Sequence, residues 1–463
     1  MFELFESFKK YPGATIEESP LLSFTYSQFY DQICQVASGI SDLNIPKKSV
    51  IVIYGIKSQL RSMILLCGSI KAGLIPFIVE NGGMEKVKDL KFSTILTENT
   101  TTDCFESFSK SSFLSTYLLH YKICNTHFIG DENSLVIVSS SGTTAKIPKK
   151  ILLGKSETMN NILSNVQALK LTSAEKTLIV LPVSYSYGLI AQFFSHLYVG
   201  ANIVFATKNI GILQIPFLLN KHNITNIYLT PLLARLVVYY NLKCKPKANN
   251  LNFITIGGDK PYTSIIKKIV NLFNCNIYTT YGLAEAGPRV STKSFKKEDE
   301  NYMISIGTPN PNVDVQIKKT AKYDKIFNNS AIGILNIQSP SVFLGYIKGN
   351  KIQKPVSAKM IKTKDLGMKM DNGEIVLLGR SDQYFVSNGK PVWFYDLNEE
   401  IYESDNVIKV KIQKKTKMLI DVFYRGILEE NNVVNSLQQK YGIENNKDYN
   451  IQFIKYDGNQ YYK

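Results

Sequence analysis

The chain has 463 residues, which is enough for two or three domains. Its 44% hydrophobic and 20% charged residues are ordinary globular values, and they exclude a disordered or fibrous protein. The formal net charge is +16, but the lysines are spread along the sequence and form no basic stripe with interleaved aromatics, so we expect no nucleic-acid partner.

The first part of the chain alternates short apolar runs with helical patterns. Residues 49–54 predict a strand, a helical pattern follows to about residue 71, and residues 74–79 predict the next strand. Similar apolar runs recur at 135–138, 177–181, 202–205, 226–229, 253–256 and 276–278. Strands that are apolar on both faces and separated by helices indicate a parallel sheet covered on both sides.

The most apolar run and the cysteines indicate the cellular compartment of the protein. Residues 63–79 are interrupted by Lys71 and two glycines, which favours a buried helix followed by a strand over a membrane span. The six cysteines form no CxxC pair, so zinc-ligand spacing is absent and free thiols in a reducing compartment are expected. The acidic start of the chain is unlike a signal peptide. We therefore predict a cytoplasmic protein.

The pattern changes from about residue 304. Strand runs at 313–317, 334–337 and 374–378 with little helix predict a small β-barrel or antiparallel sheet. After Gly379-Arg380 the pattern mixes strands, at 407–412 and 418–424, with helices. We predict an α/β protein in which residues 1–380 form a large domain with doubly wound sheets plus the small barrel. Residues 381–463 would form a small, mobile α+β lid domain.

A run of small hydroxyl residues follows the strand at 135–138. It reads Ser139-Ser140-Ser141-Gly142-Thr143-Thr144 and is followed by Pro148 and Lys149. Glycine lets the backbone approach a ligand closely, hydroxyl and N–H groups donate to phosphate oxygens, and lysine adds a point charge. The GxxxxGK[ST] pattern of a Walker A loop is absent. The alternative to this phosphate cradle is a Ser/Thr-rich surface turn.

Two further stretches carry candidate nucleotide-binding groups. The predicted strand at 276–278 leads into Tyr281-Gly282-Leu-Ala-Glu285, where an aromatic ring could stack on a base and a carboxylate could hold Mg²⁺. Downstream lie Asp365, which could accept both ribose hydroxyls, and Arg380, which could reach a sugar or phosphate. Taken singly, the Tyr281–Glu285 stretch is equally well explained as a strand-to-helix turn with a surface glutamate, and Asp365 and Arg380 are better explained as solvated turn charges.

Taken together and in this order, the motifs resemble the adenylate-forming superfamily of acyl-CoA synthetases, nonribosomal peptide synthetase adenylation domains and luciferases. The resemblance covers nearly the whole chain. It rests on the phosphate loop ending at Lys149, on Tyr281-Gly-Leu-Ala-Glu285, and on Gly379-Arg380-Ser-Asp382 at the predicted domain junction. The segments Leu181-Pro-Val-Ser-Tyr-Ser-Tyr-Gly-Leu189, Gly257-Gly-Asp259, Gly345-Tyr346 and Val386-Ser-Asn-Gly389-Lys-Pro-Val392 follow in the family's order.

The resemblance implies an AMP-forming ligase that uses ATP and Mg²⁺ to convert a carboxylic acid to its acyl-adenylate and then passes the acyl group to a thiol. The implied ATP- and AMP-binding residues are Ser140, Ser141, Gly142, Thr143, Thr144, Gly257, Gly258, Asp259, Tyr281, Gly282, Asp365 and Arg380. The implied catalytic residues are Lys463, Glu285 and Lys149, with Glu285 also the metal ligand. Tyr185, Ser186 and Gly188 would border the acid pocket, Asp382 would be the hinge of the lid domain, and Gly389 would lie in the thiolation loop.

The sequence departs from the family pattern at several points. The phosphate loop has Ala145 where glycine is usual and one residue more before its proline, so Lys149 and Lys150 compete for the phosphate-facing position. The usual Thr-Gly-Asp reads Thr363-Lys364-Asp365. The Pro-x-x-x-x-Gly-Lys loop that carries the adenylation lysine is missing. Lys463 stands about where that lysine is expected, and Lys455 is the alternative.

The substrate and the acceptor stay open at this stage. Residues 182–189 contain no acidic side chain to hold an ammonium group, which favours a fatty, aryl or hydroxy acid over an α-amino acid. The acceptor is coenzyme A or the phosphopantetheine of an acyl carrier protein, and the basic surface favours the acidic carrier protein. The alternatives are an amino-acid-activating adenylation enzyme and a degenerate, non-catalytic ATP-binding homologue.

Overall fold

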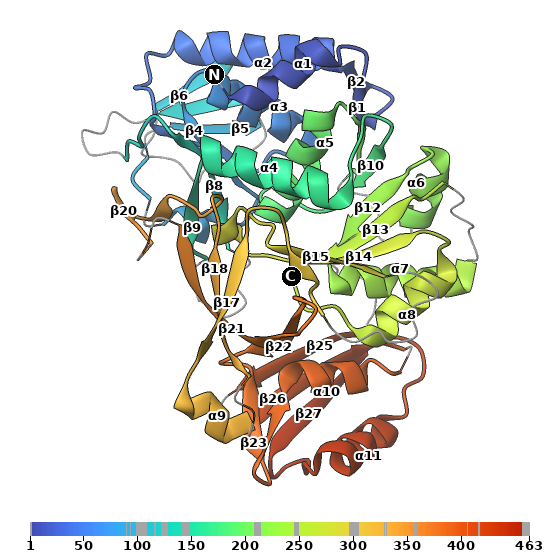
Figure 1. Cartoon of the computed structure of the whole chain (residues 1–463). Helices are drawn as coiled ribbons and strands as arrows, with labels where there is room; N and C mark the ends of the chain where they lie inside the picture. Colours follow the sequence, from blue (N-terminus) through green and yellow to red (C-terminus); the bar gives the residue numbers. More distant parts are fainter. Residues whose placement is uncertain are drawn as a thin grey trace.

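A computed structural model of the chain describes most of its residues. The described ranges are 2–88, 90–92, 94–98, 109–114, 117–121, 128–140, 148–207, 214–244, 250–295, 305–327, 329, 331–355, 357, 359–404, 406–414 and 417–455. Two large sheets, a four-stranded sheet and a group of shorter strands near the C-terminus make up the β-structure (Figure 1).

The first large sheet has nine strands in the order β20-β19-β9-β8-β4-β3-β5-β7-β6. Its central strands β8, β4, β3 and β5 are parallel, and the flanking pairs are antiparallel. The strands are β3 (Val50–Tyr54), β4 (Ile75–Val79), β5 (Thr94–Glu98), β6 (Ser109–Phe113), β7 (Tyr117–Tyr121), β8 (Ser134–Ser139), β9 (Lys150–Gly154), β19 (Gly345–Lys348) and β20 (Lys351–Gln353). Every residue of β3, β4 and β8 is buried, as expected of parallel strands covered on both faces.

The second large sheet also has nine strands, in the order β16-β15-β14-β13-β12-β10-β11-β1-β2. Six neighbouring strands from β14 to β1 are parallel, and the two ends are closed by antiparallel pairs. The strands are β1 (Thr15–Ser19), β2 (Leu22–Thr25), β10 (Lys176–Ile179), β11 (Asn202–Phe205), β12 (Asn226–Leu229), β13 (Phe253–Gly257), β14 (Asn276–Tyr281), β15 (Ser291–Phe295) and β16 (Thr308–Pro309).

Helices pack on these sheets and between them. They are α1 (Glu6–Lys10), α2 (Tyr26–Ser41), α3 (Gln59–Lys71), α4 (Lys155–Leu169), α5 (Ser195–Val199), α6 (Ile215–Lys221), α7 (Pro231–Cys244) and α8 (Thr263–Leu272), with a π-helical segment over Tyr187–Phe194. Helix α2 begins at a capping box in which Thr25 and Gln28 satisfy each other's backbone N–H groups. Helices α2 and α3 approach closely because Gly68 faces Val36, where any larger side chain would collide. The segment 63–79 is thus a buried helix and a strand, as predicted.

The third sheet is antiparallel and four-stranded, in the order β17-β18-β21-β22. Its strands are β17 (Asp314–Lys319), β18 (Gly333–Gln338), β21 (Met360–Lys369) and β22 (Ile375–Arg380). In the described part of the chain it is an open sheet and does not close, so the antiparallel alternative is observed and the barrel is not. The connection after β17 also contains a short helix, α9 (Ala321–Phe327), which the sequence pattern did not predict.

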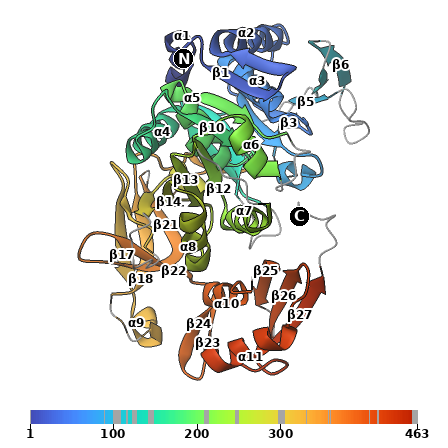
Figure 2. The ribbon, with the colours of Figure 1, turned by 90° about the vertical axis from the view of Figure 1, so that its right-hand side faces the viewer.

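The strands after Arg380 pair among themselves and lie at the opposite end of the molecule from the N-terminus (Figures 1 and 2). They are β23 (Tyr384–Ser387), β24 (Lys390–Trp393), β25 (Val407–Lys414), β26 (Met418–Tyr424) and β27 (Tyr449–Lys455), joined by helices α10 (Phe394–Ile401) and α11 (Glu430–Tyr441). They share a hydrophobic core with these two helices. The division into domains at residues 380 and 381 stays a prediction.

A buried arginine connects helix α7 to the strands that follow Arg380. Arg235 on α7 donates to the carbonyl oxygens of Val407 at 2.8 Å, Tyr402 at 3.0 Å and Ser404 at 2.7 Å. Its guanidinium also lies 4.3 Å from the centre of the Tyr402 ring. The residues around β25 are thereby tied to a helix of the large part. None of the helices in the described ranges has the length and apolarity needed to cross a bilayer.

Candidate active site

The site forms where several strands of the two large sheets end. Strand β8 ends next to Ser140, β13 ends at Gly257, and β14 ends at Tyr281. Ser140 and Lys149 close the base of the phosphate loop, because the Ser140 N–H donates to the Lys149 carbonyl and the Lys149 N–H donates to Ser140 Oγ, both at 3.0 Å. The loop therefore joins two antiparallel strands, unlike a strand-to-helix Walker loop. Ser141, Gly142, Thr143 and Thr144 lie outside the described residues.

Gly282 is required by the close return of the chain after β14. A Cβ atom at this position would stand 1.6 Å from the carbonyl oxygen of Pro288, so no other residue fits without moving the backbone. The loop between them is held from α4: the Asn161 side-chain amide donates to the carbonyls of Ala286 at 3.0 Å and Arg289 at 3.1 Å. This loop carries Glu285, so its carboxylate is placed by a rigid turn.

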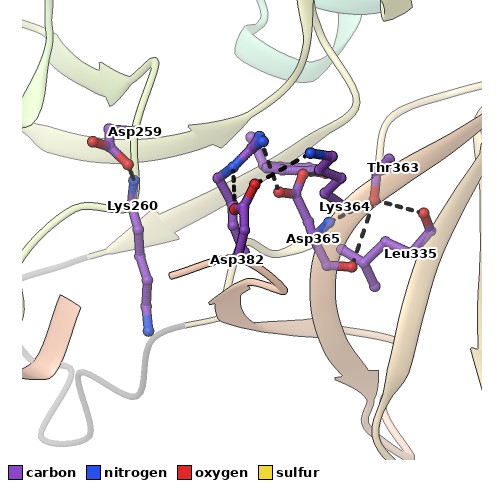
Figure 3. A network of polar contacts seen from close by, with 9 residues as sticks. Asp259, Lys260, Leu335, Thr363, Lys364, Asp365 and Asp382 are labelled. Atoms are coloured by element: carbon purple, nitrogen blue, oxygen red, sulfur yellow. Dashed lines mark hydrogen bonds and ion pairs between the residues drawn. The ribbon is translucent and has the colours of Figure 1, made fainter. Parts of the chain in front are cut away.

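Tyr281, Asp365 and Arg380, three of the predicted nucleotide-binding residues, lie together. The Tyr281 hydroxyl donates to Asp365 Oδ2 at 2.6 Å, and Arg380 Nη1 lies 4.0 Å from Asp365 Oδ1. Asp365 and Arg380 are direct partners across β21 and β22, and the Thr363 hydroxyl accepts from the Asp365 N–H at 2.9 Å. Figure 3 shows Asp365 beside Thr363, Lys364 and Asp382. The Tyr281 hydroxyl thus holds one oxygen of the buried Asp365 carboxylate, and the other oxygen faces the Arg380 guanidinium.

The two carboxylates at this junction have opposite pKa shifts. Burial raises the pKa of Asp365, although the Tyr281 hydroxyl and the Arg380 guanidinium oppose the rise. Partial burial acts in the same direction on Asp382, but the Arg380 and Lys364 cations outweigh it and hold the pKa of Asp382 below its usual value. Arg380 Nε and Lys364 Nζ each lie 3.3 Å from Asp382. Lys364, which replaces the family's glycine, therefore adds an ion pair at the predicted hinge.

Glu285 is connected to Lys149 through Tyr346. The Tyr346 hydroxyl donates to Glu285 Oε1 at 2.7 Å, and the Lys149 ammonium lies 3.4 Å from that hydroxyl and 4.5 Å from the centre of the ring. Lys150 is buried within β9, whereas Lys149 is exposed at the loop base. This difference in exposure favours Lys149, and its phosphate-facing role stays a prediction. The sequence drew attention to Tyr346 only as part of a motif, and its bridging position was not predicted.

The segment predicted to border the acid pocket leads into the π-helical turn. Gly188 lies so close to the Pro182 carbonyl that a Cβ atom would stand 2.7 Å from it, and Ser186 is buried. The Tyr185 hydroxyl lies 3.4 Å from Lys86 Nζ, which forms a 2.7 Å ion pair with Glu80. Ser184 also donates to Glu80. The sequence did not predict this Glu80–Lys86 pair, because neither residue stands in a recognisable motif.

Tyr187 is a second residue that the sequence did not single out. Its hydroxyl lies 3.1 Å from Thr255 Oγ1 on β13, and its ring lies beside Gly257 and Gly258. A Cβ atom on Gly257 would stand 3.0 Å from the Tyr187 hydroxyl, and Gly258 has a positive φ of 88°. Both glycines are therefore needed where the β13 turn meets the Tyr187 ring.

The remaining predicted residues lie around this centre. Asp259 accepts from the Lys260 N–H at 2.8 Å and lies apart from the Asp365 cluster in Figure 3. Burial lowers the pKa of Lys260 to about 8, and its ammonium lies 3.7 Å from the centre of the Tyr395 ring on α10. Gly389, with Asn388, forms the two-residue turn between β23 and β24, where both residues have positive φ. Lys463 lies outside the described residues, and Lys455 ends β27.

The described side chains do not offer a preformed multidentate metal site. No group of three or more His, Cys, Asp or Glu residues that could hold a metal occurs in the part of the chain that the structure describes. Mg²⁺ commonly binds through one or two carboxylates together with substrate phosphates and water. A single carboxylate such as Glu285, held by the Tyr346 hydroxyl, fits that mode of binding.

Comparison with known proteins gives relatives along the whole chain. The 2-succinylbenzoate–CoA ligase of Lactococcus lactis is 22% identical over 425 residues, which cover 90% of this chain and 89% of that protein. Nonribosomal peptide synthetase 2 of Cochliobolus heterostrophus is 23% identical over 394 residues; they cover 80% of this chain but only 7% of that much longer protein.

Solved structures share the fold. The o-succinylbenzoate CoA synthetase of Bacillus subtilis, in complex with its acyl-adenylate intermediate, has a TM-score of 0.76 at 15% identity and covers 98% of this chain and 94% of that one. McyG, in complex with phenylalanyl-adenylate, has a TM-score of 0.77 at 18% identity and covers 98% of this chain and 79% of that one. These likenesses confirm the predicted α/β fold.

The family model for AMP-binding enzymes matches residues 81–347, which is more than half of the chain. That match includes the phosphate loop, the Tyr281–Glu285 motif and Tyr346. It confirms the resemblance predicted from the sequence and supports the predicted AMP-forming acid–thiol ligase. The chain belongs to the family of AMP-binding enzymes.

Proposed function

We propose that this protein activates a carboxylic acid with ATP and transfers the acyl group to a thiol. The observation that carries the proposal is the convergence of two sets of side chains at the ends of β8, β13 and β14. One set, Tyr281, Asp365 and Arg380, is suited to a nucleoside. The other, Glu285 and Lys149 joined through Tyr346, is suited to phosphates and their cation.

In the first step a carboxylate oxygen of the acid attacks the α-phosphorus of ATP, and the bond to the bridging oxygen of pyrophosphate breaks. The chain's contribution is positioning and charge neutralisation. Asp365 would accept the ribose hydroxyls through the oxygen that faces Arg380, while Tyr281 would pack against adenine. Lys149 and the loop that begins at Ser140 would hold the phosphates. Mg²⁺ at Glu285 would neutralise charge on the leaving pyrophosphate.

In the second step the sulfur of the thiol attacks the acyl carbon, the carbon–oxygen bond to AMP breaks, and the thiol proton passes to solvent. We propose that Lys463 assists the first step and that the lid domain then turns about Asp382, bringing Gly389 to the acyl group. Coenzyme A is the acceptor favoured by the Lactococcus lactis relative, which is named as a CoA ligase. An acyl carrier protein, favoured by the net charge of +16, is the alternative.

An amino acid is the second candidate substrate, because the nonribosomal peptide synthetases are also relatives. The pocket segment argues against it. Glu80 is the carboxylate that the structure brings to this segment, and it is already neutralised by Lys86 at 2.7 Å. An incoming ammonium group would have to displace this buried lysine. We therefore favour an acid without an α-ammonium group.

Pyrophosphate release with ATP and Mg²⁺ tests the proposal. The panel holds fatty, aryl, hydroxy, dicarboxylic and amino acids, first without and then with CoA or a phosphopantetheinylated carrier protein. We expect release with one class of acid, loss of release in Lys463→Ala, and little change in the matched variant Lys455→Ala. ATP binding without release from any acid would instead establish a non-catalytic homologue, and loss in Lys455→Ala alone would reassign the lysine.

A further inference from the structure

A buried arginine lies behind the acid-pocket segment and has no assigned role in the reaction above. Arg289 ends the loop that carries Glu285, and it is 2% exposed. Its backbone is fixed on both sides, because its N–H donates to Asn161 Oδ1 and its carbonyl accepts from the Asn161 amide, each at 3.1 Å. Its guanidinium carbon lies 4.9 Å from the ring centre of Tyr187 and 5.4 Å from that of Tyr228.

One edge of this guanidinium is unpaired. Nε and Nη2 are buried and have no hydrogen-bond partner among the described residues, and no carboxylate of the described chain forms an ion pair with Arg289. An unpaired buried cation is costly, and proteins keep one mainly where a ligand or a buried partner completes it. The two aromatic rings stabilise the charge but leave the N–H groups in the guanidinium plane unsatisfied.

The chemistry of the unpaired edge is specific. Nε–H and one N–H of Nη2 point in parallel from the same side of the guanidinium, and this pair matches the two oxygens of a carboxylate. The neighbouring side chains do not supply such a group. Burial keeps the Tyr228 hydroxyl neutral by raising its pKa, and burial lowers the pKa of His196, which packs against Tyr228, to about 4, so that His196 is also neutral near pH 7.

Tyr187 connects Arg289 to the predicted acid-pocket segment, in which it lies. Its ring contacts the Arg289 guanidinium and also lies beside Gly257 and Gly258. The backbone of Arg289 is also one residue from the Val290 N–H, which donates to the Tyr281 carbonyl at 3.0 Å. The loop that carries Arg289 is therefore joined directly to the end of β14, and its guanidinium packs against Tyr187 of the predicted acid-pocket segment.

We propose that Arg289 binds a second carboxylate on the acid substrate, so that the preferred substrate of this enzyme is a dicarboxylic acid. The inference rests on the proposed acid-activating function and deepens it. The reacting carboxylate would meet ATP near Lys149 and Tyr281. The second carboxylate would reach past Tyr187 and receive the two parallel N–H groups of Arg289, which completes the buried cation and selects against acids with an apolar tail.

Pyrophosphate release measures this selectivity. Each dicarboxylic acid of a series of chain lengths is paired with the monocarboxylic acid of the same length, and kcat/KM is compared within each pair. For the preferred length we expect the dicarboxylic acid to exceed its partner by about 30-fold or more, as for a charge-assisted bidentate contact. Arg289→Gln should bring that ratio close to one, and Arg289→Lys, which keeps the charge without the fork, should retain part of it.

Each outcome decides the inference. Equal kcat/KM for the two members of every pair in the wild type overturns the inference, and this result requires no variant to fold. An unchanged ratio in Arg289→Gln also overturns it. If neither kind of acid releases pyrophosphate, the proposed ligase function fails. Calorimetric titration of the dicarboxylic acids into wild type and Arg289→Gln, each with a non-hydrolysable ATP analogue, then decides the Arg289 contact separately. Binding lost in the variant supports the contact, and no binding by the wild type refutes it.

Discussion

Replacing Tyr281 by phenylalanine tests whether Asp365 works as a carboxylate. The change keeps the aromatic ring that would pack on adenine and removes only the hydroxyl, which donates to Asp365 Oδ2 at 2.6 Å. Burial already raises the pKa of Asp365, and the Tyr281 hydroxyl is the first of the groups that oppose this rise. Without it, the protonated form of Asp365 persists to higher pH, and a protonated carboxyl cannot accept both ribose hydroxyls.

The size of the effect follows from the hydrogen bond. A short bond from a hydroxyl to a buried carboxylate contributes about 1.5–3 kcal/mol. Since a pKa difference of one corresponds to about 1.4 kcal/mol, the acid limb of activity should move upward by about one to two pH units. Arg380 does not replace the lost bond, because its Nη1 lies 4.0 Å from the other carboxylate oxygen.

The assay is kcat/KM for ATP in pyrophosphate release, measured from pH 5 to pH 9. We expect activity of Tyr281→Phe to approach that of the wild type at the alkaline end and to fall earlier on the acid side. Tyr26→Phe is the matched control, because it also removes a buried 2.6 Å hydrogen bond, but to the carbonyl of Ala201 far from the site. An acid limb that coincides with that of the wild type would refute the assigned role of Asp365.

Two further changes test the Glu80–Lys86 pair beside the predicted acid-pocket segment and the contact between α7 and the strands after Arg380. Glu80→Gln leaves Lys86 buried, and denaturant unfolding at pH 7 should show a loss of about 2–3 kcal/mol. Burial acts to raise the pKa of Glu80, but the bonds from Lys86 and Ser184 outweigh it and lower that pKa in the folded protein. The contribution of Glu80 to the free energy of unfolding is therefore present above pH 4.5 and is lost as the pH falls through the lower folded pKa. A difference in unfolding free energy between wild type and variant that stays constant down to pH 3 contradicts this. Arg235→Met breaks the bonds to Val407, Tyr402 and Ser404, and proteolysis after residue 380 should become faster; an unchanged rate would mean that Arg235 does not hold the C-terminal strands.

The sequence was sufficient for elements that have a strong local signal. The apolar runs that became β3, β4, β8 and β13 are buried on both faces, so their pattern is set by burial alone. The grouping of Tyr281, Asp365 and Arg380 follows from the order of the strands, because Asp365 and Arg380 pair across a hairpin and Tyr281 ends β14, which is parallel to β13. Their nucleotide-binding role stays a prediction. What remained ambiguous was the closure of the third sheet, since strand patterns alone do not tell an open sheet from a barrel.

The residues that sequence reasoning missed are those whose role depends on distant partners. Tyr346 connects Lys149 to Glu285 across 197 and 61 residues of chain, and no spacing rule predicts such a bridge. Arg289 was not singled out, because nothing in one sequence shows that its guanidinium is buried and that its Nε and Nη2 lack partners among the described residues. The lone arginine in an otherwise apolar turn was the available signal.

The contacts between the large part and the strands after Arg380 are strong enough to fix one orientation of those strands and weak enough to be exchanged for another. Besides Arg235, Tyr395 donates to the carbonyl of Pro261 at 2.8 Å, and Glu399 accepts from the Thr263 N–H at 2.7 Å. Almost all of these partners are main-chain groups, which water can satisfy when the contact opens. The Tyr395 bond contributes about 0.5–1.5 kcal/mol net, and each bond of the charged Arg235 or Glu399 about 1.5–3 kcal/mol. A few such bonds fix one orientation of the strands after Arg380, yet the differential binding of a nucleotide or an acyl-adenylate is of the size needed to exchange it for another. The hinge proposed at Asp382 is consistent with this balance, because its partners Arg380 and Lys364 lie on the large part and can keep the pivot in place while the outer contacts break.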